Sequence, residues 1–254
     1  MTHRLQTHHL SHSFGGLAVT QNVTLSLPQG ARTALIGPNG AGKTTLVNLL
    51  SGALRPQSGD IQLDGRSIVQ LPQYARVRHG IVRTFQISRL FKELTVADNV
   101  KVAVLQRRRA SMQWWPSPAR SARVQEDVDE TLGMLGLHPY ANRVVGQLAL
   151  GEQRLAEIAL ALAMKPQVLL LDEPGAGVPQ GEGGRIMEAI GSLPKDLSVL
   201  LIEHDMDLVF RFASHIIVLV AGAVLVEGTP QEVAANEQVK QIYFGRDGHA
   251  QAHH

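Results

Sequence analysis

The sequence predicts an α/β protein with a mixed, mainly parallel sheet, flanking helices, an N-terminal antiparallel β subdomain and an inserted helical subdomain. Short continuous apolar runs, which are typical of buried strands, recur along the chain with helix-like segments between them. The first thirty residues instead contain short β-like pieces and glycine turns. From residue 90 to about residue 163 the apolar residues follow helical spacing, which predicts the inserted helices.

We expect one domain over residues 1–254, built from four successive parts. A chain of 254 residues with 44% apolar residues can form one large core. The parts are a β subdomain with the first portion of the core, a helical subdomain, the remaining core with its functional strand ends, and a C-terminal helix with a tail. Their approximate boundaries are 1–86, 87–160, 161–230 and 231–254.

Composition excludes several classes of protein. The formal net charge of +2 is too small to argue for nucleic acid, so charge leaves the partner open, although no nucleic-acid partner is expected. The absence of cysteine excludes disulfides and thiolate zinc sites. The longest apolar run, at 216–226, is shorter than the roughly 20 residues of a membrane span, and the N-terminus lacks the apolar stretch of a signal peptide. We therefore expect a cytoplasmic protein that reaches a membrane only through partners.

The elements are expected in a definite order. The segment RTALIG is predicted to be a buried strand that leads into the glycine-rich GPNGAGKTTL, and TTLVNLLSGAL to be a helix closed by Gly52. A further strand, HGIVRTFQ, ends at Gln86. Three later runs, QVLLLDEP, LSVLLIEHD and HIIVLV, are predicted to be buried strands, with GRIMEAIGSL and MDLVFRFA as the helices between them. The Ala-Gly in the middle of 216–226 predicts a strand, a turn and a second strand.

The strongest chemical motif lies between the first buried strand and its helix. It fits the phosphate-binding pattern G-x-x-x-x-G-K-[ST] and comprises Gly37, Pro38, Asn39, Gly40, Ala41, Gly42, Lys43 and Thr44, followed by Thr45. Backbone N–H groups of such a loop enclose the β-phosphate, the lysine reaches the β and γ oxygens, and the threonine hydroxyl ligates magnesium. A turn without a ligand would not need Lys43-Thr44 at that offset. The motif predicts a P-loop NTPase core.

Two carboxylates end the run VLLLDE. Asp172 is expected to hold magnesium, through water, and Glu173 to polarise the attacking water as general base. The alternative is that both simply terminate a strand and cap the next helix. The phosphate loop elsewhere in the chain favours the catalytic interpretation.

Two further strand ends carry polar side chains with open interpretations. His204 could donate a hydrogen bond to the γ-phosphate as a neutral imidazole, or it could be a structural histidine. Gln86 could contact the magnesium or the attacking water, or it could be an ordinary polar loop residue. A helix that begins at the bare Leu150-Gly151 adds a possible anion site at its N-terminus.

The phosphate loop, TFQ, LALGEQR, LLLDEP and IEHD occur in the order and spacing of the ATP-binding cassette ATPases, which the chain resembles over essentially its whole length. The resemblance implies that ATP and Mg²⁺ are the cofactors and that ATP is hydrolysed to ADP and phosphate. It also implies that one subunit presses a signature segment against the γ-phosphate held by another. The signature residues are Leu148, Ala149, Leu150, Gly151 and Glu152.

The details most resemble the longer ATP-binding subunit of branched-chain amino-acid importers, through FGGLAV, GIVRTFQISRLFKELTVADNV, LLIEHDMDLV and EGTPQEV. The resemblance implies a second ATPase subunit, transmembrane permease subunits and, indirectly, a solute-binding protein as partners. It places the chain on the inner face of the membrane. Phe14 would stack on adenine, although a core or turn aromatic is an alternative. Residues 88–91 would face the permease, and Leu90 and Phe91 are expected to be an exposed pair.

The sequence departs from the broad family pattern at two positions. Ala149 stands where most signatures have serine, and Pro179 stands where many relatives carry aspartate. An ATPase of DNA repair or translation is the alternative function, and such relatives usually carry a long coiled-coil insertion or two cassettes. A non-catalytic nucleotide-binding regulator would lack Lys43 or Glu173, and both are present. The Arg- and Trp-rich segment 107–123 is interpreted as a solvated loop, with anionic lipid or a partner surface as the alternative.

Overall fold

The computed structural model divides the chain into two compact units. Unit 1 combines Met1–Gln73 with Ser198–His254, whereas unit 2 is the continuous segment Tyr74–Leu197. Two distant stretches of sequence therefore build unit 1. The structure describes residues 3–84, 90–108, 118–179 and 182–243.

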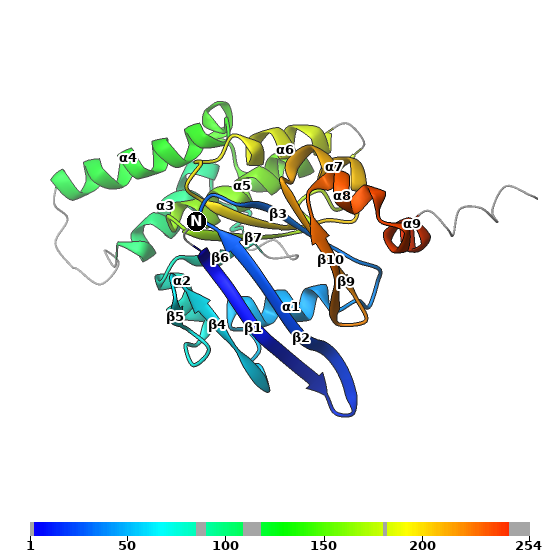
Figure 1. Cartoon of the computed structure of the whole chain (residues 1–254). Coiled ribbons are helices and arrows are strands. Elements are labelled where there is room, and N and C mark those ends of the chain that lie inside the picture. The colour runs from blue at the N-terminus through cyan, green and yellow to red at the C-terminus, as the bar shows by residue number, and fades with distance from the viewer. Residues whose placement is uncertain (1–2, 85–89, 109–117, 180–181, 244–254) are drawn as a thin grey trace, which may run out of the picture. The chain divides into compact units, whose positions relative to one another are not determined.

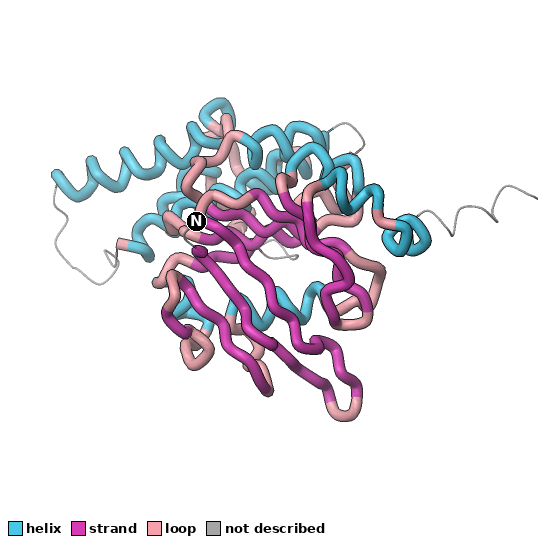
Figure 2. The backbone as a smooth tube through the Cα atoms, viewed as in Figure 1, coloured by secondary structure: helices cyan, strands magenta, loops and turns pink. Residues whose placement is uncertain are grey.

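An antiparallel sheet forms the first half of unit 1, as the sequence predicts. Its strand order is β2-β1-β4-β5, and Figure 2 shows β1 and β2 as a long hairpin of two magenta strands. Alternation between buried and accessible side chains fits a sheet with one packed face, because Leu5, Leu25 and Leu27 are all buried. The strands are β1 (His3–Phe14), β2 (Leu17–Pro28), β4 (Ser58–Leu63) and β5 (Arg66–Ser67).

A second, mainly parallel sheet of unit 1 has the strand order β10-β9-β3-β8. β3 is parallel to both of its neighbours, and only β10 is antiparallel. The continuous apolar runs are explained by burial on both faces, since Ala34, Leu35 and Ile36 have no exposed surface. The predicted strand, turn and strand at 216–226 is confirmed. The strands are β3 (Arg32–Ile36), β8 (Ser198–Ile202), β9 (His215–Val220) and β10 (Ala223–Gly228).

Four helices lie among the described residues of unit 1, and several of their ends follow ordinary capping chemistry. Gly52 ends α1 in the left-handed conformation, while Asp205 and Thr229 accept backbone hydrogen bonds at the starts of α7 and α8. The sequence predicts one C-terminal helix, but the structure has two. The chain turns at Asn236, whose Oδ1 accepts from the N–H groups of Gln238 and Val239 and starts a new helix. The helices are α1 (Lys43–Ser51), α7 (Met206–Phe212), α8 (Pro230–Ala235) and α9 (Glu237–Tyr243).

Unit 2 contains a parallel pair of strands, five α-helices and two short 3-10 helices among its described residues. The helical region predicted after residue 90 is confirmed by three of these helices, which pack on one another. None of the helices in the described ranges is long and apolar enough to cross a membrane. The elements are α2 (Gln73–Arg78), β6 (Ile81–Arg83), α3 (Val96–Arg107), α4 (Pro118–Met134), α5 (Leu150–Ala163), β7 (Val168–Asp172) and α6 (Glu182–Gly191).

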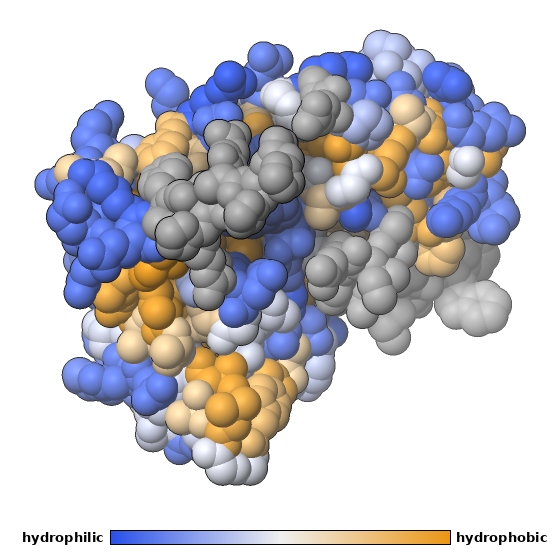
Figure 3. All heavy atoms as spheres, turned by 90° about the vertical axis from the view of Figure 1, so that its right-hand side faces the viewer, coloured by the Kyte–Doolittle hydropathy of each residue, from blue (hydrophilic) through white to orange (hydrophobic). Residues whose placement is uncertain are grey.

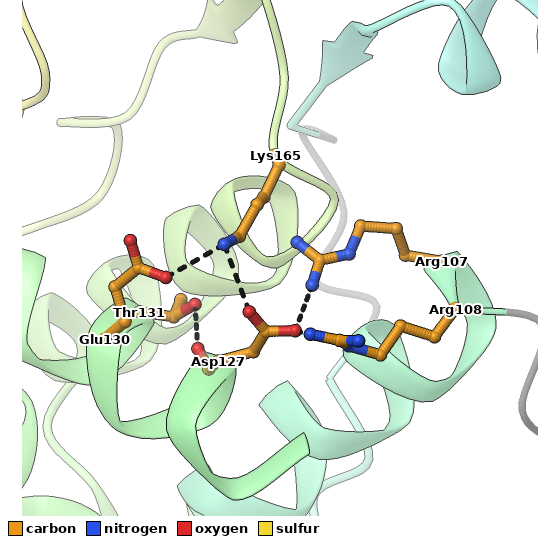
Figure 4. A network of polar contacts seen from close by, with 6 residues as sticks. All are labelled: Arg107, Arg108, Asp127, Glu130, Thr131 and Lys165. Carbon is orange, nitrogen blue, oxygen red and sulfur yellow. Dashed lines mark hydrogen bonds and ion pairs between the residues drawn. The ribbon is translucent and has the colours of Figure 1, made fainter. Parts of the chain in front are cut away.

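A buried carboxylate joins the three long helices of unit 2 (Figure 4). Asp127 of α4 accepts from Arg107 and from Arg108 Nε at 2.6 Å, at the end of α3. Lys165, just after α5, lies 3.1 Å from the same carboxylate and 3.0 Å from Glu130. Burial alone would raise the pKa of the Asp127 carboxyl, but the hydrogen bonds from Arg108 and Lys165 outweigh it and hold the pKa below its ordinary value.

The pKa of Asp127 predicts how stability should change with pH. Because its pKa is lower in the folded chain than the ordinary value of about 3.9, its contribution is complete above that value and is lost as the pH falls through the folded pKa. We expect Asp127→Asn to reduce the free energy of unfolding at pH 7, with a difference from wild type that shrinks below about pH 4. Urea unfolding at several pH values measures this.

A matched control is available at Glu130, which is half exposed and contacts the same lysine. Glu130→Gln should change stability by less than about 1 kcal/mol, as is usual for an exposed ion pair. Equal losses for both variants would contradict the role assigned to Asp127.

Candidate functional site: a phosphate loop and its companion residues

The phosphate loop connects β3 to α1 in unit 1. Lys43 is the first residue of α1, and its ammonium donates to the Gly37 carbonyl at 2.6 Å and to the Pro38 carbonyl at 3.1 Å. Asn39, Gly40 and Thr44 are exposed. The first turn of α1 contains no acidic residue, so its N–H groups and helix dipole favour an anion there.

Two glycines of this loop allow the backbone to pass very close to other strands. A Cβ at Gly37 would lie 2.2 Å from the carbonyl oxygen of Leu219, and one at Gly42 would lie 2.4 Å from that of Val19. Gly42 also has φ +98°, which a side chain would disfavour. The turn after β9 adds a hydrogen bond from Gly222 N–H to the Ala41 carbonyl at 3.0 Å. The loop shape is therefore fixed by neighbouring backbone.

Phe14 ends β1 at the tip of the β1–β2 hairpin and is 51% exposed. This exposure contradicts a core aromatic, whereas the position next to the turn fits the alternative of a turn aromatic. Its ring meets His12 edge to face, with ring centroids 4.8 Å apart, and Leu17 across the turn is also exposed. The hairpin is found at the bottom of Figure 1, and hydrophobic side chains lie at the surface near the bottom of Figure 3. An exposed aromatic of this kind can stack on a planar ring.

His204 follows β8 and its side chain is 68% exposed. The side chain is therefore not packed in the core, and its Nδ1 lies 3.7 Å from Glu203 Oε2. Its backbone N–H donates to Glu203 Oε2 at 3.1 Å, and the Glu203 side chain is almost fully buried. The sequence analysis missed Glu203, although an acid directly before a strand-end histidine was a visible signal.

Asp172 ends β7 in unit 2 and is 7% exposed. Arg83 Nη2, at the end of the neighbouring β6, donates to Asp172 Oδ2 at 2.5 Å. A buried carboxylate requires such a partner because its desolvation is costly. The sequence analysis missed Arg83, which is separated from Asp172 by 89 residues. Only the parallel pairing of β6 with β7 brings the two together.

Glu173 has an unusual backbone. Its φ is +48°, the left-handed region, where a non-glycine residue costs roughly 1–2 kcal/mol. A turn follows at once, with Ala176 N–H donating to the Glu173 carbonyl at 3.0 Å. Strain of this kind concentrates at functional sites. The half-buried Glu173 is held in a conformation that ordinary strand ends do not require.

The signature segment begins α5. Ala149 is the N-cap and cannot accept a hydrogen bond through its side chain, but its N–H donates to Glu152 Oε2 at 2.9 Å. Gly151 is buried in the first turn, and a Cβ there would lie 2.6 Å from Glu182 Oε2 of α6. Ala149, Glu152 and Glu182 are among the residues that line a small pocket at this place. The sequence analysis did not anticipate Glu182.

The prediction that Leu90 and Phe91 are both exposed is wrong for Leu90 and correct for Phe91. Leu90 is 8% exposed and belongs to the core, whereas Phe91 is 52% exposed. The buried Asn99 fixes this orientation, because its Oδ1 accepts from Phe91 N–H at 2.8 Å and its Nδ2 donates to the Phe91 carbonyl at 3.0 Å. Gln86, Ser88 and residues 109–117 lie outside the described residues. The interpretation of 107–123 as a loop is wrong at its two ends, because α3 runs to Arg107 and α4 begins at Pro118. Pro179 is exposed.

Comparisons with known proteins agree with these features. The sequence profile of the ABC transporter family matches residues 20–176, and that of the branched-chain amino acid ATP-binding cassette transporter matches residues 223–249. The branched-chain amino acid transport ATP-binding protein BraF of Pseudomonas aeruginosa is 41% identical over 250 residues, which are 95% of this chain and 97% of BraF. LivG of Escherichia coli is 39% identical over 239 residues, 91% of this chain and 94% of LivG.

A solved structure shows the same fold. MJ1267 in its ADP conformation, described as an ATP-binding cassette of an ABC transporter, has a TM-score of 0.82 and 29% identity. The match covers 96% of this chain and all of that one. The chain thus belongs to the ABC transporter family, whose cassettes bind nucleotide. Its role in that family is the ATP-binding and ATP-hydrolysing subunit of a membrane transporter, and the alternative in DNA repair or translation finds no support.

The backbone conformation of Glu173 predicts that glycine is more stabilising than alanine at this position. We expect Glu173→Gly to unfold with a free energy about 1 kcal/mol higher than Glu173→Ala, because glycine adopts positive φ without the Cβ clash. Both variants remove the carboxylate, so the comparison isolates the backbone. Thermal and urea unfolding measure the difference. An alanine variant as stable as the glycine variant would show that no strain is stored at this residue.

Proposed function

We propose that this chain powers the import of branched-chain amino acids, from the inner face of the cell membrane. Its partners are transmembrane permease subunits, a second ATPase subunit and, indirectly, a solute-binding protein. No nucleic-acid partner is proposed. The observation that carries this proposal is the 41% identity to BraF over 95% of the chain. The match at residues 223–249 to the branched-chain profile supports the same solute class.

The residues proposed to bind the nucleotide in unit 1 are those of the phosphate loop. N–H groups from Gly40 to Thr45 enclose the β-phosphate, and Lys43 neutralises the β and γ oxygens. Support comes from the half-buried Lys43 ammonium, which already lies among carbonyls at the loop. Phe14 stacks on the adenine, and the exposed His204 donates to the γ-phosphate.

Magnesium is proposed to be held by Thr44, Gln86 and Asp172. These donors fit a hard cation that prefers oxygen ligands, usually one or two protein groups with phosphates and water. Among the described residues there is no cluster of three or more His, Cys, Asp or Glu side chains that would form a cage for another metal. When bound, the ion neutralises charge on the β- and γ-phosphates.

Arg83 and Glu173 are proposed to complete the chemistry in unit 2. Arg83 orients the Asp172 carboxylate by donating to Oδ2, so that the carboxylate would hold a water of the ion. The Glu173 carboxylate accepts a proton from the attacking water, so that ATP becomes ADP and phosphate. The left-handed backbone at Glu173 supports this assignment.

The signature of one subunit is proposed to contact the γ-phosphate held by the other. Because Ala149 lacks a hydroxyl, recognition depends on the Gly151 N–H and on the positive end of α5. Phe91 is proposed to contact the permease, since it is the exposed member of its pair and its backbone is held by Asn99.

Reconstitution tests the function directly. The chain, the permeases and the second ATPase subunit are placed in liposomes, and ATP-dependent uptake of labelled leucine is compared with uptake of glutamate. We expect leucine uptake that requires ATP, and we expect Phe91→Ser to keep ATP hydrolysis but lose uptake. Uptake of another class of solute in place of leucine would overturn the proposed substrate.

Two substitutions should separate nucleotide binding from hydrolysis. Glu173→Gln is expected to abolish turnover, by about 100-fold or more, while ATP affinity stays near that of wild type, because the phosphate loop is intact. Lys43→Ala is expected to weaken ATP binding itself. Phosphate release and equilibrium binding of a fluorescent ATP analogue measure the two properties. Wild-type turnover in Glu173→Gln would contradict the general-base role.

Mixing two inactive variants tests whether the signature acts in trans. Gly151→Asp places a carboxylate beside Glu182 and beside the site of the phosphate, so it should abolish hydrolysis more completely than the isosteric Gly151→Asn. A dimer of Lys43→Ala with Gly151→Asp contains one sound site. Partial recovery that rises with protein concentration is expected when the chain pairs with itself.

The same experiment is run in the complete transporter with the second ATPase subunit. There, the phosphate-loop substitution is introduced into one ATPase subunit and the signature substitution into the other, and then the reverse. Circular dichroism and co-purification establish that both variants fold and assemble. If ATP hydrolysis recovered in no combination of the two substitutions, the result would argue against a signature that acts in trans.

A further inference from the structure

Strand β1 extends beyond the end of its neighbour β4. The two strands pair as far as Ser11 of β1, which lies opposite Ser58, the first residue of β4. β1 itself continues to Phe14. In a strand the N–H and the carbonyl of one residue point to the same side. Both groups of Ser13 face the side on which β4 offers no further residue.

Gln57, the residue before β4, supplies the missing partner. Its own N–H donates to the Ser11 carbonyl at 3.0 Å. Its side-chain Oε1 accepts from Ser13 N–H at 2.9 Å, and its Nε2 donates to the Ser13 carbonyl at 3.2 Å. The side-chain amide thus makes the two hydrogen bonds that a paired strand residue would make. Pro56, which precedes Gln57, has no N–H with which its backbone could continue the ladder.

The contact with Ser13 acts on the next residue, Phe14. The Ser13 carbonyl belongs to the peptide unit that ends at the Phe14 Cα, and because this unit is planar, holding its oxygen restricts the position of that Cα. Alternate residues of a strand share one face, and the ring of His12 meets the Phe14 ring edge to face at 4.8 Å. Backbone and ring of Phe14 are therefore both held, while half of its surface stays exposed.

The same hairpin contacts the phosphate loop of unit 1. Phe14 pairs with Leu17 at the start of β2. Two residues further along β2, the Val19 carbonyl oxygen lies 2.4 Å from the position of a Cβ on Gly42. Backbone contacts thus connect the exposed ring to the loop. A nucleotide that reaches from one to the other has to match the spacing that these contacts set.

We propose that Gln57 is a positioning residue for the Phe14 ring, and that it strengthens stacking of the adenine base through the Ser13 peptide. The inference rests on the proposed stacking of adenine on Phe14. A ring that is already in place loses less conformational entropy when a base stacks on it. Without the Gln57 amide, the Ser13 peptide exchanges both hydrogen bonds for water, and the end of the hairpin is no longer fixed from the β4 side.

Gln57→Ala tests the proposal with two probes, ATP and inorganic triphosphate, which lacks the base and the ribose. Displacement of a fluorescent ATP analogue from the full chain, with magnesium present, measures both Kd values. We expect the Kd for ATP to rise about 2- to 10-fold, the effect of one or two neutral hydrogen bonds. The Kd for triphosphate should stay at its wild-type value. The ratio of the two separates lost base recognition from damage to the phosphate loop.

Gln62→Ala is the matched control. Gln62 is a glutamine of β4 whose Nε2 donates to Asp60 Oδ2 at 3.0 Å, within the same strand. Its replacement should leave both Kd values unchanged. In a Phe14→Ala background, Gln57→Ala should cause no further rise in the Kd for ATP, because no ring remains to be positioned. Circular dichroism establishes that each variant folds.

A folded Gln57→Ala variant with the wild-type Kd for ATP would overturn the inference, as would equal losses of affinity for ATP and triphosphate. The proposed stacking survives either result if Phe14→Ala alone raises the Kd for ATP and not that for triphosphate. If Phe14→Ala keeps the wild-type ratio of Kd values, the stacking role falls and this inference with it. A wild-type chain that binds no ATP would overturn the proposed function itself.

Discussion

The close approach of backbone to backbone around the phosphate loop is the constraint on which the rest of this site depends. At Gly37 and at Gly42 a carbonyl of a neighbouring strand occupies the space of a side chain. Because those carbonyls belong to β9 and β2, both sheets of unit 1 shape the same loop. The consequence is a fixed set of N–H directions at the start of α1, obtained without any acidic residue in its first turn.

Charge is distributed differently in the two units. In unit 1 the phosphate loop presents Lys43 and a helix N-terminus, which together suit an anion. In unit 2 the buried carboxylates are paired: Asp172 with Arg83, and Asp127 with cations from the end of α3 and from the segment after α5. Pairing with Arg83 makes burial of the Asp172 carboxylate tolerable. A partner or ligand is proposed for the exposed side chains of Phe14, Phe91 and His204.

Much of the fold could be predicted because the signals are local. Continuous apolar runs marked β3, β7, β8 and β9, and the pattern of Gly37 to Thr44 identified its loop with its strand and helix. Turn and cap residues such as Gly52 and the 221–222 turn were also readable.

The remaining features depend on tertiary pairing that no local pattern contains. Arg83 donates to Asp172 only after β6 pairs with β7. The hydrogen bonds of Asn99 to Phe91 and the close approach of Glu182 to Gly151 likewise form only after separate elements pack. Leu90 was expected to be exposed with Phe91, but adjacent residues point to different environments and only one of them could face outward. The positive φ of Glu173 likewise reflects the turn that follows it and not its residue type.

The central claim is that the loop after β3 recognises a β-phosphate. Equilibrium binding of AMP, ADP and ATP to the purified chain, measured by calorimetry in the presence of magnesium, tests it most directly. The account predicts that ADP and ATP bind at least about 10-fold more tightly than AMP, because charge-assisted hydrogen bonds from the loop and Lys43 require the second phosphate. Equal affinities for AMP and ADP would contradict it.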